Sequence, residues 1–91
     1  MDKCLHILVR GKVQGVYFRA SARERALELR LRGIVRNLRD GRVEILIQGD
    51  STSLERFLDW CRQGPPNARV DDLQAQDSTA DGNFETFTIA Y

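Results

Sequence analysis

The sequence predicts an α+β fold in which two helices cover one face of a mostly antiparallel sheet. Apolar residues alternate with a period of two in several short segments and recur at helical spacing in two longer ones. These segments follow one another in the order β-α-β-β-α-β, and one more strand follows at the carboxyl end of the chain. A chain of 91 residues is long enough for one two-layer core, so we expect a single domain over residues 1–91.

The first strand and the first helix are separated by a short glycine loop. Residues 4–10 alternate between two faces, and the predicted core face carries Leu5, Ile7 and Val9. Apolar residues at helical spacing begin at Phe18 and stand beside charged residues, which predicts an amphipathic helix. Gly33 is expected to end that helix.

A β-hairpin is predicted in the middle of the chain. Residues 34–38 and 42–48 flank Asp40-Gly41, a dipeptide typical of tight hairpin turns. The second arm places its apolar side chains on one face, and these are Val43, Ile45 and Ile47.

The second helix is expected to begin near Thr52, because Thr52 and Glu55 form a capping-box pattern. Its predicted buried residues are Leu54, Phe57, Leu58 and Cys61. The helix should end at Gly64, which two prolines follow. Beyond it, the pattern indicates a fourth strand at residues 70–76, a polar loop at 77–82 and a final strand at 84–91.

This order of elements is that of a ferredoxin-like α/β sandwich. Because many unrelated functions share this fold, the function has to be argued from particular residues.

Composition and charge exclude several classes of protein. No apolar stretch approaches the roughly 20 residues that cross a bilayer, and the amino terminus lacks the pattern of a secretory signal, so we expect a cytoplasmic protein without membrane contact. His6 is the only histidine and lies in the first strand, where we expect a structural role. Cys4 and Cys61 lack the spacing of metal or redox motifs, and the sequence leaves open whether they form a disulfide. We expect neither a metal nor another cofactor.

The charges are unevenly distributed. Residues 10–42 contain ten Lys or Arg and three Asp or Glu, a net charge of +7, whereas residues 43–91 contain three and nine, a net charge of −6. The basic half would attract an anionic small molecule or a nucleic acid.

The glycine loop has the features of an anion-binding site. Gly11 and Gly15 allow unusual backbone conformations, and the amides of the first helical turn have no partner within the helix. Arg19, in that first turn, adds a permanently charged guanidinium.

Two segments of the chain resemble the signatures of the acylphosphatase family. The pattern Gly-x-Val-Gln-Gly-Val-x-Phe-Arg is matched by Gly11, Val13, Gln14, Gly15, Val16, Phe18 and Arg19. The pattern Gly-x-Val-x-Asn-x-x-Asp-Gly-x-Val is matched by Gly33, Val35, Asn37, Asp40, Gly41 and Val43. Residues 64–70 and 87–91 are similar to later parts of the family, and the chain departs from it only at variable positions, such as Lys12, Tyr17 and Ala90.

The resemblance implies an acylphosphatase-like fold and hydrolysis of the carboxyl-phosphate bond of acyl phosphates. It implies that Arg19 stabilises the phosphoryl group and that Asn37 holds the attacking water. We expect the backbone of the loop to bind the phosphate, through Gly15, Val16, Tyr17, Phe18 and Arg19. Gln14 and Tyr17 are expected to be loop-shaping or packing residues.

The residues are compatible with this chemistry. An acyl phosphate expels a carboxylate, which is a stable anion at neutral pH, so the reaction needs no strong general acid. Charge stabilisation and an oriented water suffice, and we expect a monomeric, metal-independent enzyme.

Two alternatives stay open. One is a non-enzymatic anion- or RNA-binding module, although residues 5–10 and 43–48 carry no aromatic side chain on which a base could stack, so nucleic acid is not expected. The other is an accessory domain of a larger protein, such as the amino-terminal part of a carbamoyl-transfer maturation protein.

Overall fold

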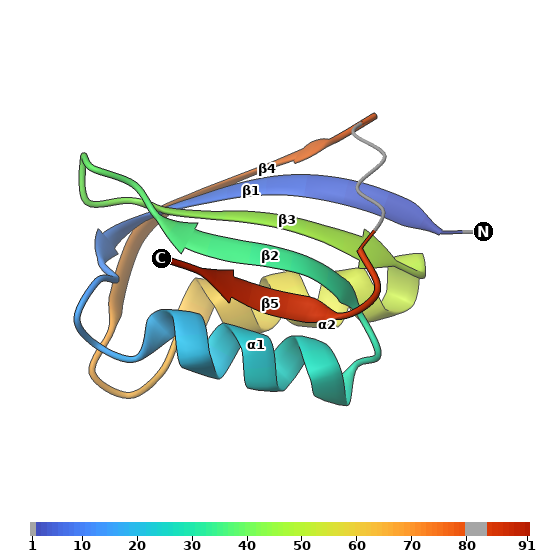
Figure 1. Cartoon of the computed structure of the whole chain (residues 1–91). Helices are drawn as coiled ribbons and strands as arrows, with labels where there is room; N and C mark the ends of the chain where they lie inside the picture. Colours follow the sequence, from blue (N-terminus) through green and yellow to red (C-terminus); the bar gives the residue numbers. More distant parts are fainter. Residues whose placement is uncertain (1, 80–83) are drawn as a thin grey trace.

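The computed structural model describes residues 2–79 and 84–91 and has the predicted order of elements (Figure 1). Its helices and strands are β1 (Lys3–Lys12), α1 (Phe18–Glu28), β2 (Arg32–Asn37), β3 (Val43–Gly49), α2 (Ser51–Gln63), β4 (Arg69–Asp77) and β5 (Phe87–Ala90). Both helices lie on the same face of the sheet, as the sequence predicts.

The five strands form one sheet in the order β4-β1-β3-β2-β5. β1 pairs antiparallel with β3 and β4, and β2 pairs antiparallel with β3. β5 pairs in parallel with β2 at one edge, with Ala90 beside Arg36. The sheet is therefore mostly antiparallel, and its parallel edge brings the last residues of the chain close to the end of β2.

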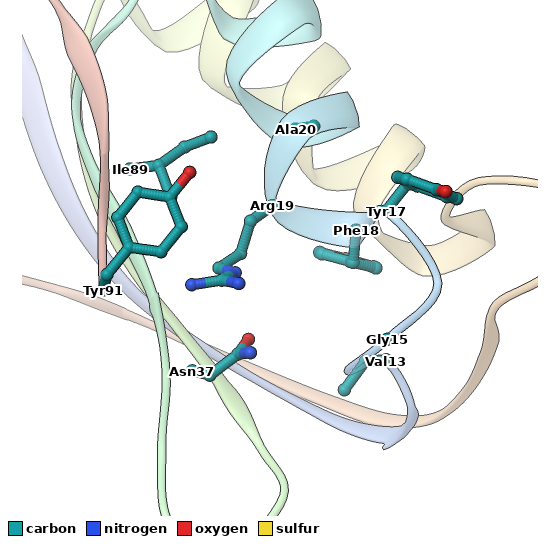
Figure 2. A pocket seen from close by; sticks show the side chains of 9 residues that line it. All are labelled: Val13, Gly15, Tyr17, Phe18, Arg19, Ala20, Asn37, Ile89 and Tyr91. Atoms are coloured by element: carbon teal, nitrogen blue, oxygen red, sulfur yellow. The ribbon is translucent and has the colours of Figure 1, made fainter.

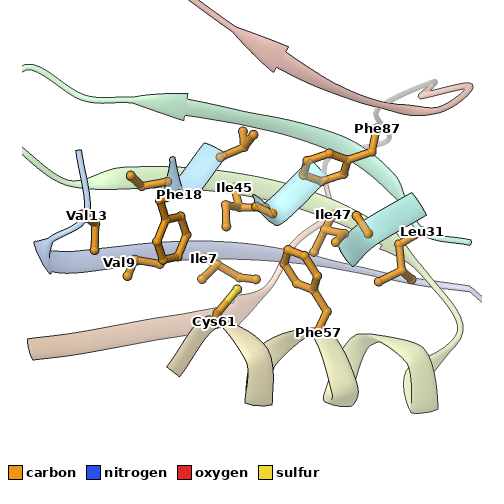
Figure 3. Packing of buried hydrophobic residues seen from close by; sticks show 14 of the residues in the cluster. Ile7, Val9, Val13, Phe18, Leu31, Ile45, Ile47, Phe57, Cys61 and Phe87 are labelled. Carbon is orange, nitrogen blue, oxygen red and sulfur yellow. The ribbon is translucent and has the colours of Figure 1, made fainter. Parts of the chain in front are cut away.

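The core lies between the sheet and the two helices (Figure 3). The predicted core faces of β1 and β3 are confirmed, since Ile7, Val9, Val43, Ile45 and Ile47 are fully buried. Leu5 packs at the rim of this cluster and is only partly buried. Aromatic rings join the helices, with the ring centroids of Phe18 and Trp60 5.3 Å apart. This contact packs the first turn of α1 against α2.

The first helix ends earlier than predicted. It stops at Glu28, and Arg30 adopts a left-handed conformation with a φ of 59°. The amides of Arg30 and Leu31 donate to the carbonyl oxygens of Leu27 and Ala26, which satisfies carbonyls of the last turn. Gly33 lies inside β2 and does not terminate the helix.

The predicted capping box of the second helix is wrong. Asp50 caps α2, and its side chain accepts a hydrogen bond from the backbone amide of Ser53 at 3.1 Å. The helix therefore begins at Ser51, one residue before Thr52. An aspartate with an extended backbone serves this position well, because its carboxylate satisfies an amide that has no helical partner.

The remaining elements differ from the prediction only in where they begin or end. The hairpin turn is confirmed, with the Leu38 amide donating to the Arg42 carbonyl oxygen at 2.8 Å. β4 includes Asp77, which the sequence placed in a loop, and residues 80–82 of that predicted loop lie outside the described residues. β5 is shorter than predicted and begins at Phe87.

The cysteines are unpaired, and the histidine contacts a neighbouring strand. Cys4 and Cys61 are both free thiols, so the open question of a disulfide is answered, and Cys61 is buried in the core. His6 Nε2 lies 2.9 Å from Glu44 Oε2 of the neighbouring strand. Within the described part of the chain, no helix is long and apolar enough to cross a bilayer.

Candidate active site

A cavity of about 390 Å³ lies between the β1–α1 loop, the end of β2 and the end of the chain (Figure 2). It is lined by Val13, Gly15, Tyr17, Phe18, Arg19, Ala20, Asn37, Ile89 and Tyr91. The structure thus brings together five of the six predicted site residues. Val16 is the exception, because its side chain is buried in the core with 6% of its surface exposed. Val16 can contribute to the cavity only through its backbone.

The loop is shaped by two residues with positive φ. Gly15 has a φ of 75° and Tyr17, which precedes α1, has a φ of 64°. No side chain caps the start of α1, and among the described residues the backbone amides of residues 15–19 donate no hydrogen bond to a protein group. Unpaired amides at a helix start attract an anion, so the loop is a suitable site for phosphate oxygens.

Gln14 connects this loop to the hairpin. Its side-chain Nε2 donates to the carbonyl oxygens of Leu38, at 2.7 Å, and Arg42, at 3.0 Å. These two bonds join the glycine loop to the turn that follows Asn37. The expected loop-shaping role of Gln14 is thereby confirmed.

Arg19 lies in the first turn of α1 and extends across the cavity toward β5. Its Nη1 donates to the Ala90 carbonyl oxygen at 3.1 Å, and its guanidinium carbon is 4.8 Å from the centre of the Tyr91 ring. Within the described residues, Arg19 forms no ion pair with a carboxylate. The two contacts hold the group in place while leaving its charge available for an anion.

Asn37 is the last residue of β2 and faces α1. It follows Gly33 and Val35 at every second position, so its side chain lies on the face of the sheet that the helices cover. Its Oδ1 is buried and accepts no hydrogen bond from the described residues. In Figure 2 its amide points toward the guanidinium of Arg19. A buried acceptor without a protein partner is rare and costs stability, which indicates a polar ligand at this position.

Sequence reasoning missed the contribution of the last residues. Ile89 and Tyr91 line the cavity and Ala90 binds Arg19. In the sequence, only the similarity of residues 87–91 to the family's last strand pointed to these three residues. Of the two roles expected for Tyr17, shaping the loop agrees with its φ of 64°, whereas packing does not, because 79% of its surface is exposed.

The electrostatics of the cavity favour anions. Arg19 is the only charged side chain among the lining residues that the structure describes. Across residues 2–79 and 84–91, no group of three or more His, Cys, Asp or Glu side chains is arranged to hold a metal ion.

The topology is that of a ferredoxin-like α/β sandwich with a glycine loop after its first strand. The family model described as acylphosphatase matches residues 5–89. The chain is 51% identical over 87 residues to an acylphosphatase of Methylococcus capsulatus, covering 96% of this chain and 95% of that protein. The chain therefore belongs to the acylphosphatase family.

Solved structures agree with this assignment. An acylphosphatase from Bacillus subtilis has 36% identity and a TM-score of 0.93, and the match covers both chains completely. An acylphosphatase from Coxiella burnetii has 37% identity and a TM-score of 0.93, covering 98% of this chain and 93% of that one. The predictions of family, fold and enzyme class are confirmed, and the protein is an enzyme with acylphosphatase activity on acyl phosphates.

Proposed function

We propose that the amides of residues 15–19 and the guanidinium of Arg19 bind the phosphoryl group of an acyl phosphate, and that Asn37 orients the attacking water. The observation that carries this proposal is the common cavity of Arg19 and Asn37, in which the Asn37 Oδ1 has no partner among the described residues. The family resemblance implies the same two roles.

Arg19 and the loop amides supply positive charge where the phosphoryl oxygens bind. In phosphoryl transfer, charge spreads over the equatorial oxygens of the transferring group, so fixed donors lower the barrier without rearranging. The contacts of Arg19 with Ala90 and Tyr91 support this role, because they restrict the side chain before substrate arrives.

Asn37 aligns the water and does not act as a base. Its amide offers an acceptor for a water proton and a donor for a second oxygen. The water oxygen attacks phosphorus, the bond between phosphorus and the acyl oxygen breaks, and the carboxylate leaves with the bonding electrons. The phosphate oxygens take up the water proton. Because the carboxylate is a good leaving group, the reaction requires no general acid, and we propose that it is metal-independent.

Hydrolysis of benzoyl phosphate in excess chelator tests these roles. We expect Asn37→Ala to lower kcat about 100-fold or more with little change in KM, because water loses its alignment. Arg19→Ala should lower kcat by a similar factor and also weaken inhibition by inorganic phosphate.

Arg23→Ala is the matched control. Arg23 lies one turn further along α1 and donates from Nε to the Phe87 carbonyl oxygen of β5 at 3.3 Å, but it does not line the cavity. Its replacement should leave kcat and KM within about twofold of wild type.

Unchanged kinetic constants in the Arg19 and Asn37 variants would contradict the assigned roles. If the folded wild-type protein lost its turnover in chelator, metal independence would be wrong. Salt-sensitive binding of single-stranded RNA without any hydrolysis would instead support the binding-module alternative.

A further inference from the structure

We propose that a groove between α1 and α2 is a second anion site, and that it binds inorganic phosphate, the product of the reaction. The groove has a volume of about 270 Å³ and shares no lining residue with the cavity of Arg19 and Asn37. The second site does not depend on the roles proposed for those two residues. The residues that line the groove are Arg25, Arg56, Asp59, Trp60 and Gln63.

The periodicity of α2 places most of this lining on one side of the helix. Arg56, Trp60 and Gln63 stand at positions i, i+4 and i+7, which form a stripe along a helix. This stripe is distinct from the buried one, which contains Phe57 and Cys61. The other wall of the groove is α1, which lies beside α2 on the same face of the sheet (Figure 1).

The α2 wall offers hydrogen-bond donors that have no acceptor. Among the described residues, Arg56 forms no ion pair, and neither its guanidinium nor the side chains of Trp60 and Gln63 form a hydrogen bond. The carboxylate of Asp59 is already occupied, because Arg62 Nη1 donates to its Oδ1 at 2.9 Å. The free guanidinium, indole N–H and amide therefore favour an anion in the groove.

Arg25 brings a second, incompletely paired charge from α1. Its Nε is buried and has no hydrogen-bond partner among the described residues, while 37% of the side chain is exposed. Its Nη1 lies 3.9 Å from Glu28 Oε1, which is beyond hydrogen-bond distance. A guanidinium that is partly withdrawn from water attracts an anion more strongly than a fully solvated one, because the effective dielectric constant around it is lower.

The size and chemistry of the groove favour a small oxyanion. Its volume lies below the range of about 300–1,000 Å³ that is typical of sites for organic ligands. A guanidinium presents a planar fork of donors that matches the oxygens of phosphate. Hydrolysis of an acyl phosphate releases phosphate, so the enzyme itself produces an anion that fits.

Trp60 makes the groove observable. It is the only tryptophan of the chain, so its indole N–H gives a single signal in a ¹H–¹⁵N correlation spectrum. The backbone amides of residues 15–19 report separately on the glycine loop. This separation matters because the Trp60 ring centroid is 5.3 Å from that of Phe18, which lines the other cavity.

The test is a titration of ¹⁵N-labelled protein with inorganic phosphate at constant ionic strength, so that charge screening does not change. We would compare wild type with Arg56→Gln, Arg19→Ala and Arg10→Gln. Arg10→Gln is the matched control, since it removes the same charge from β1, and Arg10 lines neither the groove nor the cavity of Arg19.

We expect the Trp60 indole signal of wild type to shift to saturation. Arg56→Gln should weaken this binding about tenfold, the effect of one lost charge-assisted hydrogen bond, and leave the response of the loop amides within about twofold. Arg19→Ala should weaken the response of the loop amides and leave that of Trp60 within about twofold. Arg10→Gln should keep both dissociation constants near those of wild type.

A Trp60 signal that does not shift, or that shifts with the same dissociation constant in Arg56→Gln, would overturn the second site. Loss of the Trp60 response in Arg19→Ala would overturn it as well, because Trp60 would then report phosphate at the glycine loop through Phe18. If Trp60 responded as expected but the loop amides did not, phosphate binding by the loop would be wrong and the second site would stand.

Discussion

The side-chain amide of Gln14 donates a hydrogen bond of 2.7 Å to the carbonyl oxygen of Leu38, 24 positions further along the chain. The same nitrogen also donates to Arg42. One side chain therefore links the glycine loop to the turn that follows Asn37.

Gln14→Ala is expected to lower both stability and activity. It removes two hydrogen bonds, while the carbonyl oxygens of Leu38 and Arg42 keep their backbone donors. Two lost hydrogen bonds should cost about 1–3 kcal/mol in the free energy of unfolding. It should also reduce kcat/KM for acyl phosphates, because the loop and Asn37 lose their common anchor. Urea unfolding and steady-state kinetics would measure the two effects. Gln74→Ala, at an exposed position of β4, is the control, and equal stability of the two variants would refute the coupling.

Asp50→Ala should destabilise the protein by about 1 kcal/mol, because the amide of Ser53 loses the carboxylate that caps α2. Thr52→Ala and Glu55→Ala should each change the unfolding free energy by less than about 0.5 kcal/mol. Thermal unfolding of the three variants decides between the two caps. A larger loss in Thr52→Ala than in Asp50→Ala would restore the capping box that the sequence suggested.

Gly33→Ala should be among the most damaging single substitutions. A Cβ on Gly33 would lie 2.0 Å from the Leu46 carbonyl oxygen and 2.9 Å from the Ile47 Cα of β3, so the strands would have to separate. We expect a loss of about 3 kcal/mol or more, or failure to fold.

Gly15→Ala separates steric overlap from backbone strain. Gly15 has a φ of 75°, but a Cβ there would meet nothing within 4 Å. Only the left-handed conformation is penalised, by about 1–2 kcal/mol. Urea unfolding would measure the stability of Gly15→Ala and Gly33→Ala. Similar losses of unfolding free energy in the two variants would show that close approach of the strands is not what requires glycine at position 33.

Stability should fall in acid through Glu44. Its pKa lies below the ordinary value of 4.5, chiefly because of its hydrogen bond with His6 and secondly because of Arg36. The interaction therefore stabilises the fold fully above pH 4.5 and is lost as the pH falls through the lower pKa of the folded state. Unfolding free energies measured from pH 3 to 6 should decline less steeply for Glu44→Gln than for wild type. Glu55→Gln, on the exposed side of α2, is the control and should show the same pH dependence of unfolding free energy as wild type. If Glu44→Gln also showed the wild-type dependence, the interactions of Glu44 would not contribute to stability.

The sequence by itself determined the order of the elements, the faces of β1 and β3 that form the core, the hairpin turn and the glycine loop. These features follow from local periodicity and from backbone requirements of single residues, such as the turn at Asp40-Gly41. The family signatures added the roles expected of Arg19 and Asn37.

Only the tertiary structure decided which groups surround Arg19. Asn37 faces it because β2 is paired in register with β3, and Ala90 and Tyr91 reach it because β5 joins the edge of the sheet in parallel. The exposed ring of Tyr17 and the cap at Asp50 also depend on how the loop and helix are packed. Pairing between distant segments is selected by the total burial and hydrogen bonding of the whole fold, and no short stretch of sequence contains that information.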